Sequence, residues 1–466
     1  MSTAPHTTPY YWQGEWVDEE EAGRRLGTLG QILPALPGPL DPAHVLAACG
    51  RLAGLLADPD SAVYRQLLDD LTDPATTALP AVDAELSLAL LASALTPGLL
   101  AAQLTAELGG TAPHRPVPAP FADGAAELWQ PVGTLVHIAP RNVASGGFLS
   151  VVEGLLAGNV NLVKTSGGES LFTQHALAAL ADADPSGELR GRLVVLRFSS
   201  RRTEWLRALC RPADAVAVWG TEEAVQGVAG LLPPGCRLVE WGPKISLAYL
   251  DRTGGPRGGG TLRALARDIL RNGQRTCTSP QVVYVDTADP EVLFAEARAL
   301  GEALSAEAAH FPAFPRETAE QAEITNVVTV ARLEEHLGLT RTFSAPDGGW
   351  HVLADTRPGL SASPLFGTVW VKPLPREEIV RVLHPMRRYL QTVGLHAAAD
   401  STLPLATEFF RAGALRVVPL GTMLESYAGA PHDGQLALQR YSRRVSVATP
   451  AEAGAGFRPR AGQAAA

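Results

Sequence analysis

Apolar runs and amphipathic segments alternate through the middle of the chain. After residue 128, apolar runs with β-branched residues predict buried strands at 133–139, 160–163, 193–198, 215–219 and 236–240. Helices are expected between them, at 148–157, 171–181, 203–210 and 222–232. Strands that alternate with short helices predict parallel βαβ units. Because these strands are mainly apolar along their length, both faces of the sheet should be covered, and the pattern predicts an α/β fold.

The second half of the chain continues this alternation around a polar loop. A helix is expected at 261–270, followed by the polar stretch 271–280 and by a strand at 281–286. Next come a helix at 290–309, strands at 326–331, 350–354 and 368–371, and a helix near 376–390. The alternating segment 441–448 predicts a final strand that is exposed on one face.

The N-terminal part of the chain and its C-terminal tail follow other patterns. Residues 43–108 are rich in Ala and Leu at helical spacing, and four prolines between 59 and 97 divide them into three or four helices. Residues 1–32 mix aromatic, acidic and glycine residues and predict an irregular arm with short strands. Residues 451–466 are rich in Ala and Gly and predict a disordered tail.

Composition narrows the classes of function. The 466 residues are 46% hydrophobic and 19% charged, which is typical of a globular protein. The net charge of −9, without a run of Lys and Arg, argues against a binder of nucleic acid or of anionic membranes. No apolar run approaches the ~20 residues of a membrane span, and the N-terminus lacks the pattern of a signal peptide. We therefore expect a cytoplasmic protein whose four cysteines are reduced.

The four cysteines differ in their surroundings. Three of them, Cys49, Cys210 and Cys236, have apolar or turn neighbours and are expected to be structural. Cys277 follows Arg275 in a polar loop between a helix and a strand, where a nearby cation favours the thiolate. It is the candidate nucleophile, and a bystander thiol is the alternative. The chain contains no Cys-x-x-Cys, so no metal site is predicted.

Polar residues follow several of the predicted strands, where parallel sheets bind ligands. Asn142 precedes a helix and is a candidate donor to an oxyanion, with a turn residue as the alternative. Lys164 ends a strand and is either a ligand contact or a surface lysine. Gly220 and Thr221 begin a helix, where they either contact a cofactor phosphate or form a plain helix cap.

Several common catalytic signatures are absent from the sequence. No Gly-x-Gly-x-x-Gly follows a strand, and there is no P-loop, no His-Glu-x-x-His and no Gly-x-Ser-x-Gly. His432-Asp-Gly434 is a suggestive turn, with a plain loop as the alternative.

Taken in order, the polar segments resemble the aldehyde dehydrogenase superfamily and, within it, the LuxC-type long-chain acyl-CoA reductases. The resemblance runs from about Pro131 to Val447. It is carried by Pro131-Val-Gly133, Asn142, Lys164-Thr-Ser166, Gly220-Thr221, Glu240-Trp-Gly-Pro-Lys244, Asn272-Gly-Gln-Arg-Thr-Cys277 and Leu365-Phe-Gly367. The features that favour the reductases are Cys277-Thr-Ser-Pro-Gln281, Gly242-Pro-Lys-Ile-Ser246, Tyr389-Leu-Gln-Thr-Val-Gly394 and His432-Asp-Gly434.

The resemblance implies two Rossmann-like domains with parallel sheets. A helical N-terminal region and a cofactor-binding domain would occupy residues 1–244, and a catalytic domain with the nucleophilic cysteine would occupy 245–430. Residues 431–450 would return as a strand of a small oligomerisation extension, which implies a homo-oligomer. The family also implies a partner, an acyl-activating synthetase that supplies acyl groups.

The resemblance also implies an activity, the NADPH-dependent reduction of fatty acyl-CoA to fatty aldehyde, with NADH as the alternative cofactor. Cys277 would form an acyl-enzyme thioester, and Asn142 would stabilise the oxyanion. Lys164, Ser166, Gly220 and Thr221 would bind the cofactor. Two other activities stay open: an aldehyde dehydrogenase that oxidises aldehydes with water, and a cofactor-free thiol acyltransferase.

Two positions show how far this chain follows the superfamily pattern: one departs from it and one keeps it. Pro364 stands where the family usually has a glutamate that holds the nicotinamide ribose, so contacts at the ribose must differ. Glu240 keeps the place of the base that activates water in hydrolytic members, although a reductase does not need that water. Glu240 is therefore a candidate catalytic residue that favours the oxidative alternative, or else a proton relay or a structural residue.

Overall fold

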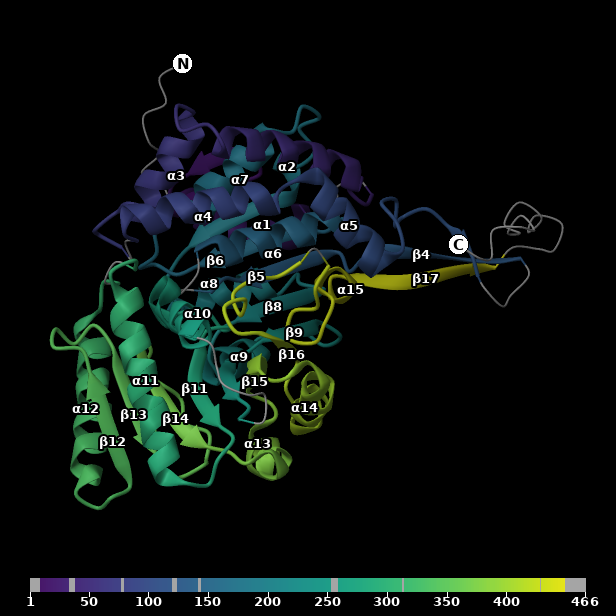
Figure 1. Ribbon diagram of the computed structural model, residues 1–466. Helices are drawn as coiled ribbons and strands as arrows, with labels where there is room; N and C mark the ends of the chain where they lie inside the picture. Colours follow the sequence, from purple (N-terminus) through teal and green to yellow (C-terminus); the bar gives the residue numbers. More distant parts are fainter. Residues whose placement is uncertain are drawn as a thin grey trace. The chain divides into compact units, whose positions relative to one another are not determined.

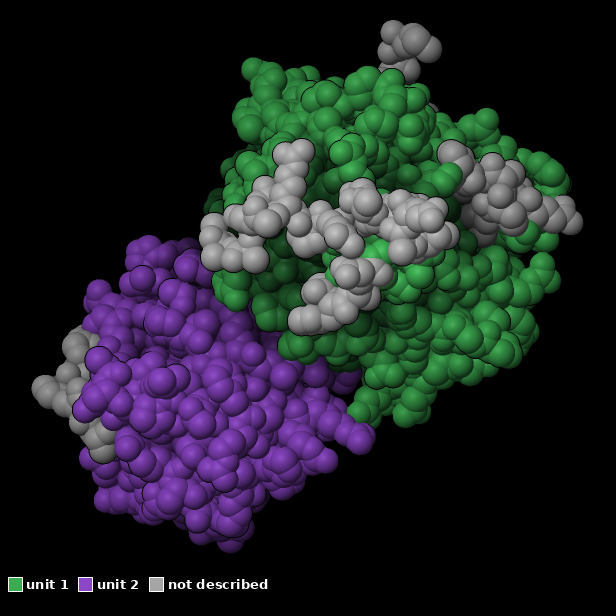
Figure 2. All heavy atoms as spheres, turned by 90° about the vertical axis from the view of Figure 1, so that its right-hand side faces the viewer, with its two compact units in different colours: residues 1–242, 427–466 green, residues 243–426 purple. Residues whose placement is uncertain are grey.

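A computed structural model describes residues 9–32, 38–76, 79–119, 124–140, 144–252, 259–311, 314–427 and 429–448. The chain divides into two compact units, which Figure 2 shows in different colours. The first unit comprises Met1–Gly242 and Tyr427–Ala466, and the second comprises Pro243–Ser426. The predicted tail at 451–466 lies outside the described residues.

The first unit is built on a seven-stranded sheet with the order β2-β1-β7-β6-β5-β8-β9. Its five parallel strands are β5 (Thr134–Ile138), β6 (Val160–Thr165), β7 (Leu193–Arg197), β8 (Ala215–Trp219) and β9 (Arg237–Trp241). β1 (Tyr10–Trp12) and β2 (Glu15–Val17) add an antiparallel edge. The parallel strands lie where the apolar runs of the sequence predict them.

Helices cover both faces of this sheet, as its apolar strands require. α6 (Ala144–Leu156) and α7 (Phe172–Asp182) pack on one face. The other face carries α1 (Glu19–Ile32), α8 (Thr203–Cys210) and α9 (Glu222–Ala229). The expected irregular arm at 1–32 is therefore wrong for residues 19–32. Helix α1 buries Ala22, Leu26 and Leu29, an i, i+4, i+7 spacing that its glycines and charges obscure in the sequence.

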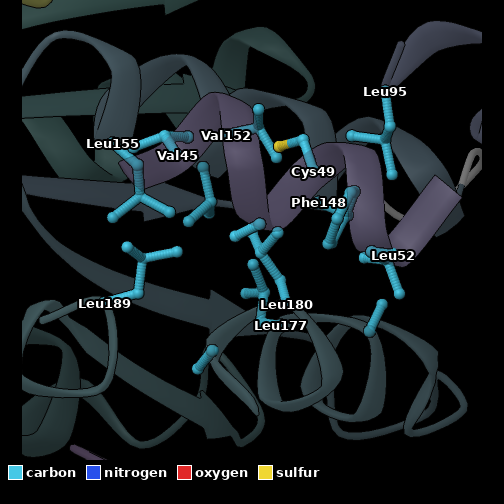
Figure 3. Close-up of a cluster of buried hydrophobic side chains, with 14 of the residues drawn as sticks. Val45, Cys49, Leu52, Leu95, Phe148, Val152, Leu155, Leu177, Leu180 and Leu189 are labelled. Carbon is cyan, nitrogen blue, oxygen red and sulfur yellow. The ribbon is translucent and has the colours of Figure 1, made fainter. Parts of the chain in front are cut away.

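Four further helices form a layer over α6 and α7 (Figure 1). They are α2 (Pro42–Leu56), α3 (Ala62–Thr72), α4 (Ala81–Ala94) and α5 (Pro97–Leu108). Asp41 caps α2 by accepting from the Ala43 N–H, and Ser61 caps α3. Figure 3 shows the shared core, in which Cys49 and Leu52 of α2 lie near Phe148 and Val152 of α6.

A small three-stranded sheet extends from the first unit. β4 (Ala125–Pro131) pairs antiparallel with β17 (Ser442–Ala448) and with β3 (Val117–Pro118), and Figure 1 shows β4 and β17 side by side. Tyr441, directly before β17, is completely buried, and its hydroxyl lies 3.0 Å from the Ser150 Oγ. The Trp241 Nε1 donates to the same hydroxyl at 3.3 Å. The extension is thus anchored in the core of the unit.

The second unit is built on another seven-stranded sheet, with the order β12-β13-β14-β11-β10-β15-β16. Its parallel strands are β10 (Ile245–Leu250), β11 (Pro280–Val285), β13 (His351–Asp355), β14 (Thr368–Pro373), β15 (Leu390–His396) and β16 (Arg416–Pro419). β12 (Thr340–Ser344) pairs antiparallel at one edge. Two parallel-rich sheets with helices confirm the predicted α/β fold class.

Helices also cover both faces of the second sheet. α10 (Gly259–Leu270) and α11 (Pro290–Ala308) pack on one face. α13 (Ile379–Leu383) and α14 (Ala399–Ala412) pack on the other, and α12 (Thr318–Glu335) joins them over Leu353 and Phe366. A short helix, α15 (Ala437–Arg440), belongs to the first unit.

The strand expected at 326–331 is wrong, because these residues lie within α12. A run of valine and threonine mimics a strand there. The buried residues of α12, however, are Ile324, Val328 and Ala331, which recur at helical spacing. Glu320 also accepts a hydrogen bond from the Glu317 N–H at 2.7 Å, in the manner of a capping box at the helix start.

No single helix among the described residues is both long and apolar enough to span a membrane. α4 and α5 meet that test only as a pair, and the chain bends by 58° between them.

Two carboxyl groups meet where α15 docks on the first unit. The Gln103 Nε2 donates to Glu107 at 2.9 Å and to Glu153 at 3.2 Å. Glu107 also accepts from the Leu438 N–H at 2.7 Å. Burial, together with the neighbouring Glu107 carboxylate, raises the pKa of Glu153 to about 8. The folded protein therefore favours the protonated form of Glu153.

Because the pKa of Glu153 is raised on folding, ionisation of this group destabilises the folded state. The penalty accumulates from the ordinary glutamate pKa up to about 8. We expect Glu153→Gln to raise the midpoint of thermal unfolding at pH 9 by at least about 3 °C more than at pH 5. Calorimetry of both proteins across this pH range measures the difference. A shift that is equal at both ends of the range would contradict the assignment.

Candidate active site

The carboxyl edge of the first sheet carries the predicted cofactor-binding residues. From β5 the chain moves outward to β6 and β7, and it then returns to β8 on the other side of β5. This reversal places a topological switch point between β5 and β8, where α/β sheets bind ligands. Lys164, Ser166, Gly220 and Thr221 all lie at this edge. Asn142, which follows β5, lies outside the described residues.

Lys164 is a buried cation and not a surface lysine. Only 5% of the residue is exposed, and its Nζ donates to the Ser200 Oγ at 2.8 Å. The ammonium lies 5.8 Å from the centre of the Phe198 ring. The charge of Lys164, next to the last residue of β6, is thus enclosed by the loop that follows β7. Ser166 is half-buried, and its N–H donates to Glu169 at 3.2 Å.

Gly220 and Thr221 form the turn between β8 and α9. The Thr221 Oγ1 accepts from the Ala224 N–H at 3.4 Å, so this residue serves as the helix cap. The Gly220 N–H donates to the Trp241 carbonyl at 3.3 Å. A Cβ at Gly220 would meet the Ala224 Cβ at 3.1 Å, so a small residue suits this close turn.

An aromatic cluster that the sequence analysis missed lies beside this turn. Trp219 stacks on Trp241 with ring centres 5.1 Å apart, and the His432 imidazole lies 5.1 and 5.0 Å from the two rings. The His432-Asp-Gly434 turn holds the imidazole there, because His432 and Gln435 exchange two backbone hydrogen bonds of 2.8 Å. Glu240 is the neighbour of Trp241 on β9 and is exposed. Only the His-Asp-Gly motif signals this cluster in the sequence.

Cys277 lies in the second unit, at the amino edge of its sheet, directly before β11. It occupies a tight turn that the Ser279 N–H closes by donating to the Thr276 carbonyl at 3.0 Å. The buried Ser246 of β10 donates its hydroxyl to the Cys277 carbonyl at 2.6 Å. Cys277 itself is half-buried. The thiol therefore lies on a loop whose backbone is held by a hydrogen bond from the neighbouring strand β10.

Gln274, which the sequence analysis did not single out, holds the same loop from the side. It is completely buried, and its Nε2 donates to the Pro280 carbonyl at 2.7 Å. Its Oε1 accepts from the Gly367 N–H at 3.0 Å. These contacts arise from the tertiary fold, and no local pattern in the sequence reports them.

Two left-handed turns meet at Gln274. Asn272, Gly273 and Gln274 have φ of 54°, 58° and 64°, and Leu365-Phe-Gly367 has φ of 67°, 51° and 76°. The Phe366 N–H donates to the Gly273 carbonyl at 3.0 Å. Non-glycine residues reach this region at a cost of about 1–2 kcal/mol each. Such a conformation persists where surrounding contacts over-determine it, often at functional sites.

Gly273 has no room for a side chain, because a Cβ would meet the Phe314 ring at 2.8 Å. The Arg275 guanidinium lies 5.2 Å from the centre of the same ring. Phe314 therefore closes the side of the loop. Pro364 precedes the second left-handed turn, at the place where the superfamily pattern would put a glutamate.

The other cysteines are poor nucleophiles. Cys49 and Cys210 are completely buried, and burial raises the pKa of each thiol to about 12. Cys236 is half-buried, and burial raises its pKa as well. Cys277 is thus set apart from the other three by its loop.

Comparison with known protein families shows to which family this chain belongs. A sequence model of the acyl-CoA reductase (LuxC) family matches residues 42–444. The chain belongs to this family. The predicted resemblance to the LuxC-type reductases is therefore confirmed.

Curated relatives carry the name long-chain acyl-protein thioester reductase. The protein from Vibrio harveyi is 26% identical over 324 residues, which cover 69% of this chain and 65% of the relative. The protein from Aliivibrio fischeri is 24% identical over 326 residues, again covering 69% of this chain and 65% of the relative. The chain thus matches less than two thirds of the length of these LuxC-type relatives.

Solved structures that resemble this LuxC-family chain show its fold. A putative aldehyde dehydrogenase from Burkholderia cenocepacia has a TM-score of 0.72 at 17% identity, and the match covers 94% of this chain and 99% of the other. Glyceraldehyde-3-phosphate dehydrogenase from Methanocaldococcus jannaschii, complexed with NADP, has a TM-score of 0.68 at 13% identity and covers 96% and 99%. The aldehyde-dehydrogenase-like fold predicted from the sequence is confirmed.

The settings of the cysteines predict a selective reaction with iodoacetamide. We expect the native protein to be modified at Cys277 at least about tenfold faster than at Cys236, because burial keeps Cys236 protonated. Cys49 and Cys210 should react only after unfolding. Peptide mapping by mass spectrometry at increasing times measures the order, with denatured protein as the control. Earlier modification of Cys236 than of Cys277 would contradict this ranking.

Proposed function

We propose that the protein reduces a long-chain fatty acyl thioester to a fatty aldehyde through an acyl-enzyme on Cys277. The observation that carries the proposal is the half-buried Cys277 thiol on a turn fixed by Ser246 and Gln274. A rigid loop with a single candidate nucleophile suits covalent catalysis. Membership of the acyl-CoA reductase (LuxC) family supports the same activity.

In the first step of the proposed reaction, the Cys277 thiolate attacks the carbonyl carbon of the acyl thioester. A new carbon–sulfur bond forms, and the bond to the leaving thiol breaks as the tetrahedral oxyanion collapses. The Asn142 side chain and the Cys277 N–H are the proposed donors to that oxyanion, and the loss of such a donor costs about 10²–10³ in rate. The thiol leaves with a proton, and the acyl group stays on Cys277.

A bound nicotinamide cofactor supplies the hydride that reduces the acyl carbon. The thiohemiacetal that results is a substrate adduct of Cys277, and its collapse releases the aldehyde and restores the thiolate. No water is required in this direction. Glu240 is then free to relay a proton to solvent, which its exposed position on β9 allows.

The first unit suits the proposed cofactor. Lys164 and Ser166 would contact its adenosine end, and Gly220 and Thr221 would lie near its phosphates. The buried Lys164 ammonium at the carboxyl edge of the sheet, on the strand next to β5, supports this, since a fixed cation favours an anionic ligand. A cation at this position also favours the 2′-phosphate of NADPH over NADH. The glyceraldehyde-3-phosphate dehydrogenase that shares the fold is complexed with NADP, which agrees with that choice.

The proposed substrate is a fatty acyl-CoA. The LuxC-type relatives are named for acyl-protein thioesters, and Cys277 would exchange with either thioester by the same chemistry. An acyl-activating synthetase is the proposed partner that supplies acyl groups. The β4–β17 extension supports a homo-oligomer, because its outer strand β17 has one unpaired edge among the described strands. We place the reaction in the cytoplasm, where thiols stay reduced.

A second activity, aldehyde oxidation with water, is favoured by one observation. Glu240 retains the place of the hydrolytic base and is exposed on β9. Oxidation would need this carboxylate to activate water against the Cys277 thioester.

The test mixes the purified protein with NADPH and acyl-CoAs of graded chain length and follows nicotinamide absorbance and aldehyde together. We expect acyl-CoA-dependent oxidation of NADPH, faster than that of NADH, with one aldehyde formed per nucleotide. Cys277→Ala should lower the rate by at least about 10³-fold, because the covalent step is lost.

Two other results would overturn this proposal. Reduction of NAD(P)⁺ by an added aldehyde, without acyl-CoA reduction, would assign the oxidative activity and give Glu240 the role of base. Acyl transfer by Cys277 without binding of either nucleotide would assign a thiol acyltransferase.

A further inference from the structure

Gln274 is an unexpected residue type for its backbone conformation. Its φ of 64° lies in the left-handed region, which favours Gly or Asn, and the residue is completely buried. A long amide loses conformational freedom and hydration when it is buried, so its polar atoms must be paired. Both ends of the Gln274 amide are paired, one with the first residue of β11 and the other with the residue before β14.

The donor end of the amide spans the nucleophile loop. The Gln274 Nε2 donates to the Pro280 carbonyl at 2.7 Å, and Pro280 begins β11. Cys277 lies between these two residues in the chain. This bond therefore fixes the distance between the two ends of the segment that carries Cys277.

The acceptor end of the amide reaches the next strand of the sheet. The Gln274 Oε1 accepts from the Gly367 N–H at 3.0 Å, and Gly367 directly precedes β14. β14 is the parallel neighbour of β11. One side chain thus ties together the starts of two adjacent strands, and the bond from the Phe366 N–H to the Gly273 carbonyl reinforces the link.

We propose that Gln274 is a positioning residue for the proposed acyl transfer, holding the Cys277 turn in the geometry that stabilises the oxyanion. The inference rests on the proposed function. The Ser246 hydroxyl donates to the Cys277 carbonyl, and the Gln274 amide donates to the Pro280 carbonyl. The turn is therefore fixed by two hydrogen bonds. The direction of the Cys277 N–H, a proposed oxyanion donor, follows from the turn. A misplacement of about 1 Å can cost about 10²-fold in rate.

A positioning role can be distinguished from a general loss of structure by comparing two reactions of Cys277, acylation and alkylation. Alkylation of Cys277 by iodoacetamide passes through no oxyanion, whereas acylation does. Loosening of the turn should therefore slow acylation much more than alkylation. A collapsed loop would change both rates, and global unfolding would in addition expose the buried Cys49 and Cys210.

The experiment compares wild type, Gln274→Met and Gln274→Glu. Met fills the same space without hydrogen bonds, and Glu keeps the acceptor for the Gly367 N–H but loses the donor to Pro280. Acylation of Cys277 is followed by intact mass with a long-chain acyl-CoA and, separately, with a long-chain acyl p-nitrophenyl ester. Alkylation is followed with iodoacetamide, and kcat and KM are measured in the reductase assay.

We expect Gln274→Met to lower the acylation rate and kcat by about 10–100-fold, with KM for acyl-CoA and the alkylation rate within about threefold of wild type. Gln274→Glu should fall between the two. Tyr284→Phe is the matched control, because it removes another hydrogen bond of a buried β11 side chain, from the Tyr284 hydroxyl to the Pro358 carbonyl at 3.0 Å. It should leave all of these rates unchanged.

Acylation of Gln274→Met at the rate of wild type would overturn the inference and leave the proposed function intact. Acylation of wild type by the ester but not by acyl-CoA would overturn the proposed function, and the comparison of variants with the ester would still decide the role of Gln274. Absence of acylation of wild type by either donor would overturn both. If Gln274→Met fails to fold, the same comparison with Ser246→Ala and Gln274→Glu decides, and wild-type rates in both would overturn the fixed-turn account.

Discussion

The amide of Gln274 joins the two left-handed turns on which the candidate nucleophile depends. Left-handed residues other than glycine are unfavourable alone, and two runs of them are maintained only where other contacts over-determine the backbone. Here those contacts are the two ends of one buried side chain and the backbone bond between Phe366 and Gly273. These contacts fix the start of β11, the start of β14 and the turn of Cys277 relative to one another. A displacement of one of them should therefore displace the others.

The first unit has another feature that depends on its fold: the buried cation Lys164 lies at the edge of a mainly apolar sheet. Most side chains of its parallel strands are apolar and buried, and helices cover both faces of the sheet. The reversal of strand order gathers the carboxyl ends of the strands around β5 and β8. Lys164 stays at this edge because the loop after β7 supplies the Ser200 hydroxyl and the Phe198 ring. The sheet topology, and not any one motif, brings the proposed cofactor residues together.

Much of the fold follows from periodicity in the sequence. Apolar runs predicted the parallel strands β5, β6, β7 and β8 of the first sheet, because a short strand in a covered sheet buries residues on both faces. Residues 326–331 were misjudged, since β-branched residues occur in helices when the helical face is the one that is buried. Residues 19–32 were misjudged because a short amphipathic helix with glycines and three glutamates has a weak apolar stripe.

The site was only partly predictable, and the reason is physical. Cys277 is marked by its own polar neighbours, and Lys164 by its place at a strand end. Gln274, Ser246 and the cluster of Trp219, Trp241 and His432 act through partners far away in the chain, which a local pattern does not encode.

The structural neighbours share the fold at under 20% identity, and so the chemistry must be decided at the site itself. The most direct measurement is the intact mass of the protein after mixing with a long-chain acyl-CoA in the absence of any nicotinamide nucleotide. The account predicts the gain of one acyl group, located on Cys277 by peptide mapping and lost as aldehyde when NADPH is added. An unmodified mass, or an acyl group on another residue, would contradict it.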